Sequence, residues 1–473
     1  MLFPTVTFAA FFMVVWSVTW LAARGPGRRQ VVLVVASAVF YAYWDERLLF
    51  LLAATIVGNR VAAGAIGRWR DTRVGMACLW LGVGGHLAVL GWFKYYGFFA
   101  TSLTSALDHL GLTIQPPLVQ VALPLGISFF TFQGISHLIE VRRGVIEAGS
   151  LLEVAAWLGC FLTIASGPIT RASELLPQLR EELPTRVEAN RAFGLILRGL
   201  FKKMVLASYL ATAIADDVFA GPARHSALEV LVGIYAYAAQ LYLDFSGYTD
   251  IAIGCGLLLG IRLPENFDRP YAARSITEFW GRWHMTLSRW LRDFLFTPLA
   301  RHSHPTTVAT CRNLMIVMLL AGLWHGAAWT YVAFGAVHGV ALSAERVARV
   351  HRRRVGRRPS ASPVSEAVHR FMTFHVVCLG WVFFRAESIG GALDVLGRLV
   401  SGPGPAPAVT ALLAGVVLAV LVAQAAPASV RAALARGVAR LGAAPAVAAG
   451  AVSLLVIDVF GPEGIPPFLY FGF

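Results

Sequence analysis

Apolar runs long enough to cross a lipid bilayer recur along almost the whole of this 473-residue chain. A spanning helix needs about 20 predominantly apolar residues. Hydrophobic residues make up 57% of the chain and charged residues only 14%, and a soluble domain could not bury so much apolar surface. The sequence therefore predicts an all-α polytopic integral membrane protein that forms a single transmembrane domain over residues 1–473. Candidate spans lie near 2–22, 74–93, 119–139, 192–219, 227–260, 367–384, 409–425 and 445–460.

Three further apolar stretches are too interrupted or too short to form simple spans. Stretch 30–58 is broken by charged residues at 45–47, and stretch 151–169 leads directly into a charged segment. Stretch 312–344 has basic residues on both sides, so both ends should lie on one face of the membrane, yet it is too short for two full spans. We expect hairpin or re-entrant elements here, which brings the total to about 10–12 membrane helices, including re-entrant and interfacial ones.

Basic clusters separate the apolar runs and give the chain a formal net charge of +14. Such clusters mark the cytoplasmic ends of membrane spans. The densest, at 351–358, lies in a predicted cytoplasmic basic loop at 346–366. The distribution predicts a multi-pass protein of the cytoplasmic (inner) membrane with its N-terminus outside. Because no basic groove with interleaved aromatics is present, we expect the lipid bilayer, and no nucleic acid, as a partner.

One polar block follows an apolar run directly and contains acids, tyrosines and an asparagine. Asp244, Tyr248 and Asp250 lie in its first part, 242–250, and Asn266 lies in its second part, 264–271. Polar groups at a membrane boundary are costly unless they are paired, so the block could line a cavity or a tunnel. It could equally be an interfacial loop whose aromatic residues anchor it at the headgroups. The residues alone leave both interpretations open.

The segment 279–296 has its aromatic and aliphatic residues on one side of a helical projection and its charges on another. This pattern predicts an interfacial amphipathic helix. Arg282, Ser288 and Asp293 are its candidate tunnel-lining residues. His284 is either a polar residue at headgroup level or an imidazole that faces a cavity shared with a second histidine, His325.

His325 lies between Trp324 and Gly326 in the middle of a long apolar run. An ionisable residue at membrane depth indicates a functional site by default. A neutral imidazole can remove the proton of a hydroxyl as it attacks an activated carbonyl. His338, thirteen residues later, lies in an equally apolar setting, and physical reasoning does not separate the two.

The sequence lacks the patterns typical of nucleotide-binding loops, nucleophile elbows and metal sites, and its five cysteines stand singly. We therefore expect no metal and no bound cofactor. An intramembrane acyltransferase and a glycan or lipid transporter remain. A transporter of inverted repeats should show interrupted helices in both halves. The polar residues instead concentrate in 240–340, which favours an enzyme with its catalytic region there.

Several blocks, in this order along nearly the whole chain, resemble the membrane-bound O-acyltransferase family, in particular the membrane subunits that act in alginate O-acetylation. They are Pro124–Gln133, Ser166–Ile169, Gly199–Lys203, Tyr242–Asp250, Pro264–Tyr271, Phe279–Asp293, Gly322–Trp329, Gly380–Ala386 and Phe468–Phe473.

The resemblance implies a helical shell around a central tunnel, with His325 as the catalytic residue and His284 as a second acid, base or orienting group. It implies transfer of an acyl group, acetyl above all, from a thioester such as acetyl-CoA or an acyl carrier to an exported or cell-surface polysaccharide, by way of a periplasmic or extracellular partner enzyme. A D-alanyl transferase acting on a teichoic-acid-like polymer is the alternative within the family.

Three segments depart from the family's usual text. They are His137–Gly144, Ser208 and Ala300–Pro305. All lie away from the two proposed catalytic histidines, so the departures bear on donor or partner specificity more than on the class of reaction.

Overall fold

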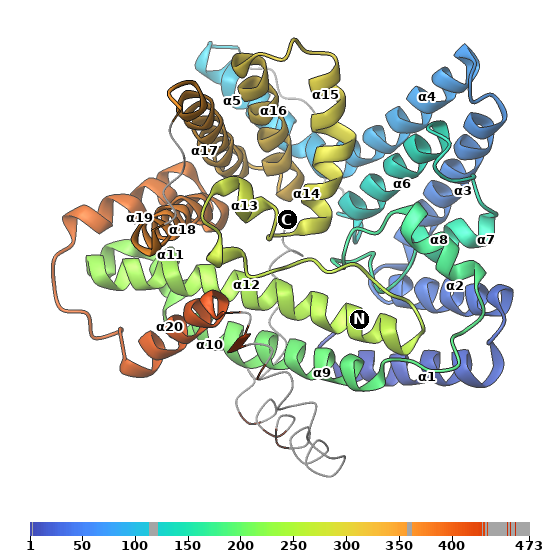
Figure 1. Ribbon diagram of the computed structural model, residues 1–473, viewed down its shortest axis with the longest axis horizontal. Coiled ribbons are helices and arrows are strands. Elements are labelled where there is room, and N and C mark those ends of the chain that lie inside the picture. Colours follow the sequence, from blue (N-terminus) through green and yellow to red (C-terminus); the bar gives the residue numbers. More distant parts are fainter. Residues whose placement is uncertain are drawn as a thin grey trace. The chain divides into compact units, whose positions relative to one another are not determined.

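The computed structural model describes Met1, residues 3–112, 122–356 and 362–427, and scattered positions beyond. Throughout these residues the regular secondary structure is helical, with no strand (Figure 1), so the predicted all-α class is confirmed. Contacts divide the chain into two compact units. One comprises residues 1–196 and 249–264, and the other comprises residues 197–248 and 265–473.

The first unit is built from helices that pair in chain order. The loops between them are short, and polar side chains mark several helix starts; Asp45, for example, accepts a hydrogen bond from the Arg47 backbone N–H at 2.9 Å. The helices are α1 (Val6–Ala22), α2 (Pro26–Ala42), α3 (Glu46–Arg68), α4 (Arg73–Leu90), a π-helical segment (Gly91–Tyr95), α5 (Tyr96–His109), α6 (Ile127–Arg142), α7 (Leu151–Leu158), α8 (Ala172–Arg180) and most of α9 (Ala189–Leu200).

The second unit contains the end of α9 and most of the C-terminal helices. The long helix α12 crosses the division, because its residues from Thr249 onward belong to the first unit. The helices are α10 (Ser208–Leu210), α11 (Asp216–Ala220), α12 (Ala227–Leu258), α13 (Ile276–Trp280), α14 (Met285–Leu291), α15 (Thr297–Arg301), α16 (Thr307–His325), α17 (Trp329–Arg354), α18 (Pro363–Arg385), α19 (Ile389–Ser401) and α20 (Ala411–Ala425), with π-helical segments at Phe201–Ala207, Ala211–Ala215 and Arg292–Phe296.

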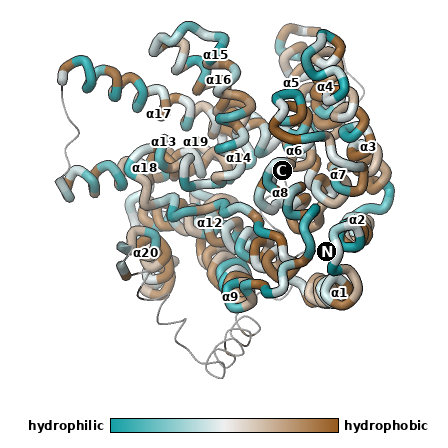
Figure 2. The backbone as a smooth tube through the Cα atoms, turned by 45° about the vertical axis from the view of Figure 1, so that its right-hand side comes forward, coloured by the Kyte–Doolittle hydropathy of each residue, from teal (hydrophilic) through white to brown (hydrophobic). Residues whose placement is uncertain are grey.

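Four helical stretches in the described part of the chain are long and apolar enough to cross a membrane. They are Glu46–Arg68, Arg73–His109, Thr307–His325 and Pro363–Arg385, and α1 and α20 are shorter apolar helices. Figure 2 shows such an apolar stretch in brown along α3. The total of 10–12 membrane helices stays a prediction. Residues 113–121, most of the predicted span 445–460 and the block 468–473 lie outside the described residues.

Two predicted interruptions are confirmed. The break at 45–47 separates α2 from α3, and α7 is short and is followed by buried turns before α8. The stretch 312–344 does form a helical hairpin that breaks directly after His325. Its arms are longer than predicted, because α16 begins at Thr307 and α17 runs to Arg354 through charged residues that we expected to end it.

Of the two interpretations left open for block 242–250, the structure excludes the interfacial loop, because the block lies inside α12 and is buried. Two other expectations are wrong. Segment 279–296 is no single amphipathic helix, because it breaks at Gly281–His284. The basic loop predicted at 346–366 is helical at both ends, in α17 and α18, since the charged residues at its start continue the helix.

Candidate functional site

His325 is the last residue of α16 and is only 2% exposed. Its ring lies among three aromatic rings, with centroid distances of 5.0 Å to Trp324, 5.7 Å to Phe334 and 5.3 Å to Phe384. The chain turns directly after it at Gly326, where a Cβ atom would lie 2.1 Å from the Tyr331 ring. The tight turn into α17 thus fixes the imidazole in an apolar, water-poor setting.

His284 lies in the break between α13 and α14 and is fully buried. Its backbone has φ of 42°, a left-handed conformation that is uncommon outside glycine and marks strain. It lies outside the four candidate spans. Burial lowers the pKa of His284 to about 3, so its ring is neutral near pH 7.

Asn266 determines which nitrogen of His284 carries the proton. The Thr286 backbone N–H donates to Asn266 Oδ1 at 3.2 Å, which identifies that atom as the oxygen of the amide. The same oxygen faces His284 Nδ1 at 3.2 Å, so Nδ1 must be the donor. His284 Nε2 therefore carries a lone pair, and it is buried with no hydrogen-bond partner among the residues the structure describes.

Trp324 brings the two histidines into one aromatic cluster. Its ring lies 5.8 Å from His284 and 5.0 Å from His325, while Phe245 of α12 meets His284 edge-on at 4.9 Å. His284, Asn266, Trp324 and His325, which sequence reasoning singled out, thus lie together in the second unit. An imidazole in such a cluster can exchange a proton with a bound hydroxyl.

His338 has a different environment. Trp280 Nε1 donates to His338 Nδ1 at 3.3 Å, and the Phe334 ring lies 4.8 Å away. A Cβ atom on Gly380 would approach His338 Nε2 to 2.7 Å. His338 is therefore packed as a core residue in contact with α13 and α18, in keeping with the family resemblance, which assigns it no role.

The other predicted site residues lie in separate local networks. Arg282 forms an ion pair with Glu278 at 2.7 Å, Ser288 donates to the Trp283 carbonyl at 3.2 Å, and Asp293 pairs with Arg292 at 2.7 Å. Tyr248 is 1% exposed within α12, and Asp250, 6% exposed, belongs to the first unit. The contacts of Arg282, Ser288 and Asp293 given above all lie within residues 278–293.

Two contacts were not predicted from the sequence. Lys203 forms an ion pair with Asp244, and both side chains are buried. Glu345 of α17 accepts a hydrogen bond from the backbone of Ile276 and others from the backbone and hydroxyl of Thr277, so it caps α13 just ahead of His284. No local pattern indicates Glu345, because its partners are 69 and 68 residues away.

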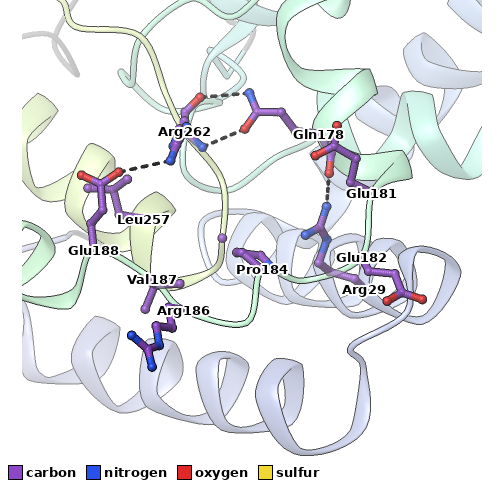
Figure 3. A pocket seen from close by; sticks show the side chains of 11 residues that line it. Arg29, Gln178, Glu181, Glu182, Pro184, Arg186, Val187, Glu188, Leu257 and Arg262 are labelled. Carbon is purple, nitrogen blue, oxygen red and sulfur yellow. Dashed lines mark hydrogen bonds and ion pairs between the residues drawn. The ribbon is translucent and has the colours of Figure 1, made fainter.

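A charged cavity of about 540 Å³ lies within the first unit (Figure 3). Gln178 bridges one wall, accepting from the Arg262 N–H at 2.9 Å and donating to its carbonyl at 3.2 Å. Arg262 also pairs with Glu188 at 3.4 Å, and the buried Arg29 donates to the Gln178 carbonyl. Arg262 and Glu188 thus compensate each other's charge in this cavity. Within the described ranges, no cluster of three or more His, Cys, Asp or Glu side chains could hold a metal ion.

Comparison with known proteins identifies the family of this chain. The model of the membrane-bound O-acyltransferase family matches residues 76–383, and the chain belongs to that family. The protein is therefore an acyltransferase and a multi-pass membrane protein, as the sequence predicted.

Among curated relatives, the chain is similar to O-acetylating proteins and to a D-alanyltransferase. The chain is 41% identical to the probable alginate O-acetylase AlgI of Pseudomonas aeruginosa, over 77% of this chain and 68% of that protein. It is 35% identical to the peptidoglycan O-acetyltransferase of Helicobacter pylori, over 80% and 75%. The teichoic acid D-alanyltransferase of Streptococcus thermophilus is more distant, at 32% identity over 55% of this chain and 68% of the relative.

Proposed function

We propose that this enzyme acetylates hydroxyl groups of an exported or cell-surface polysaccharide, taking the acetyl group from a cytoplasmic thioester such as acetyl-CoA. The observation that carries this proposal is the buried pair His284 and His325 on Trp324, in a chain whose matches to O-acetylating relatives cover more of it than the match to the D-alanyl transferase. The protein acts from the inner membrane as a single domain, with its catalytic region at 240–340.

In the proposed reaction, His325 removes the proton of the acceptor hydroxyl as the oxygen attacks the thioester carbonyl. The carbon–sulfur bond then breaks, and the thiolate leaves with the proton that the imidazole took up. His284 orients one reactant through the Nε2 lone pair that Asn266 fixes. The immediate acceptor is a periplasmic or extracellular partner enzyme that passes the acetyl group to the polymer.

The donor and the reaction are tested together in membrane vesicles. Vesicles that contain the protein should transfer label from acetyl-CoA to the polysaccharide or to the partner enzyme, and should ignore a D-alanyl carrier thioester. The matched control is vesicles from a deletion strain. Transfer from the D-alanyl carrier but not from acetyl-CoA would instead establish the D-alanyl transferase, the second candidate that the 32% identical relative supports.

The role of Asn266 gives a separate prediction. Asn266→Leu removes the oxygen that holds Nδ1–H of His284, so we expect transfer to fall by up to about 10²-fold, the loss that a misplaced catalytic group can cause. Asn266→Asp keeps an acceptor at this position and should restore most of the rate. Its negative charge should also raise the pKa of His284, so the rate should fall as the pH is lowered, which the wild type should not show.

The pH profile separates this positioning role from a purely structural one. A merely structural Asn266 would give variants that differ in protein level but keep the wild-type pH profile. An Asn266→Leu enzyme with an unchanged rate at equal membrane level would contradict the assignment.

A further inference from the structure

An apolar groove with a volume of about 620 Å³ runs along α3 and α4 in the first unit. Both helices are among the four candidate spans, so the groove lies between two elements that face the bilayer. Its rim points outward, because the lining residues Val61 and Leu81 are 65% and 76% exposed. Leu138 of α6 contributes to the floor.

Glycines on α3 and α4 mark both the point of close contact between these helices and the open part of the groove. A Cβ atom on Gly82 would lie 2.6 Å from Leu138 Cδ1 and 3.2 Å from Ala62 Cβ, so α3, α4 and α6 are in close contact there. At Gly58 and Gly85, which also line the groove, a Cβ atom would meet nothing within 4 Å in the described structure. The groove therefore stays open at the level of these two residues.

A buried hydrogen-bond network holds the groove in shape. Asn59 donates to the Gly134 carbonyl at 3.0 Å, which fixes the orientation of its amide. Its Nδ2 also faces His86 Nε2 at 2.9 Å, and its Oδ1 faces His137 Nδ1 at 2.7 Å. The network joins α3, α4 and α6, and it satisfies the polar groups of Asn59 at the base of the groove. The rest of the lining therefore offers mainly hydrocarbon contacts to an occupant.

The length and volume of the groove indicate what it can hold. From Leu51 to Ala65 the groove follows α3 for about 21 Å at 1.5 Å per residue, compared with about 15 Å for half of the hydrocarbon core. A second helix about 10 Å wide would need roughly 1,600 Å³ over that length. A carbon chain about 4 Å wide needs only roughly 260 Å³. The groove can therefore enclose a lipid chain along this length, whereas it cannot enclose a helix.

We propose that the groove between α3 and α4 binds a hydrocarbon chain of a membrane phospholipid. The hydrocarbon chain occupies the open space over Gly58 and Gly85. The rest of the phospholipid stays in the surrounding bilayer, with which the groove is continuous. This inference goes beyond the proposed function, because it concerns a lipid held by the first unit and no residue assigned to acyl transfer.

The test uses Gly85→Leu, whose side chain enters the groove, with Gly84→Leu as its matched control. Gly84 precedes Gly85 on α4, and a Cβ atom there also meets nothing within 4 Å, but Gly84 does not line the groove. The control therefore adds the same helix propensity and the same apolar surface as Gly85→Leu without filling the groove. Native mass spectra of the purified full chain should show one fewer retained phospholipid for Gly85→Leu and an unchanged number for Gly84→Leu. Gly58→Leu, on the opposite wall, should repeat the loss if Gly85→Leu fails to fold.

A phospholipid with a diazirine in its acyl chain gives an independent measurement on the wild type in vesicles. Adducts should concentrate on peptides from 51–65 and 78–89 and should decrease in Gly85→Leu but not in Gly84→Leu. Equal labelling of all exposed apolar helices, equal lipid retention by both variants, or a second polypeptide retained in place of lipid would overturn the proposal. Acetyl transfer is not the readout, so the outcome is independent of the proposed reaction.

Discussion

His325→Ala should lower acetyl transfer by about 10² to 10⁴-fold, the range that a positioned general base contributes. The ring is 2% exposed and packs against Trp324, Phe334 and Phe384, so its loss would leave an apolar site without this imidazole. The measurement is the ester-linked acetyl content of cell-surface polysaccharide in a deletion strain complemented with each variant at matched membrane levels.

Truncating a buried ring also leaves a cavity, so a second variant is needed. His325→Asn keeps a polar side chain at this position but cannot accept a proton near pH 7, and it should be as inactive as the alanine variant. His109→Ala, at the exposed end of α5, should behave as wild type. Full acetylation by His325→Asn at wild-type protein level would show that His325 is structural and would move the base role to His284.

The hairpin that carries His325 was predictable because its signals are local. Basic residues flank the apolar stretch, and Gly326 follows the histidine directly. The break after α16 therefore falls where the sequence placed it, and only the helix ends were misjudged. Charged residues such as Arg312 continue the helix by bonding to nearby side chains, here Ser303 at 2.8 Å.

The break at His284 was not predictable, because the apolar period continues across it. The break depends on backbone hydrogen bonds to residues 266–268, earlier in the chain. The Met285 backbone N–H donates to the Asn266 carbonyl at 2.9 Å, and the Asp268 N–H donates to the Arg282 carbonyl at 2.9 Å. Backbone pairing of this kind leaves no pattern in either segment. Sequence reasoning could therefore select His284 and Asn266 but could not place them in contact.

The sequence left the setting of the acids in block 242–250 open for a related reason. Charges after an apolar run indicate a membrane boundary, yet α12 continues through them. Asp244 is accommodated because Lys203, 41 residues earlier, meets it from a π-helical segment. The sequence shows two lysines in that segment but not which one turns inward. Burial of the pair became evident only from the packing of the π-helical segment against α12.

Lys203→Met should destabilise the second unit by about 3–5 kcal/mol, the usual penalty for removing one partner of a buried ion pair. The Lys203 and Asp244 side chains are 1% and 8% exposed, so water cannot replace the lost ammonium at the carboxylate. Lys202→Met is the matched control. Lys202 lies on the same segment but donates to the neutral Ser246 hydroxyl at 3.2 Å and lies over the Tyr242 ring, so its loss should matter less.

The double variant Lys203→Met with Asp244→Leu tests whether the two charges stabilise the protein through their ion pair. Apolar side chains of similar size often replace a buried pair at little cost, so the double variant should recover most of the stability that either single variant loses. Unfolding of the purified proteins in mixed micelles gives the three free energies. Additive losses in the double variant would show that the two side chains act separately. Recovery of stability without recovery of acetyl transfer would instead indicate that the charges also serve the reaction, since Phe245, the next residue after Asp244 in α12, contacts His284.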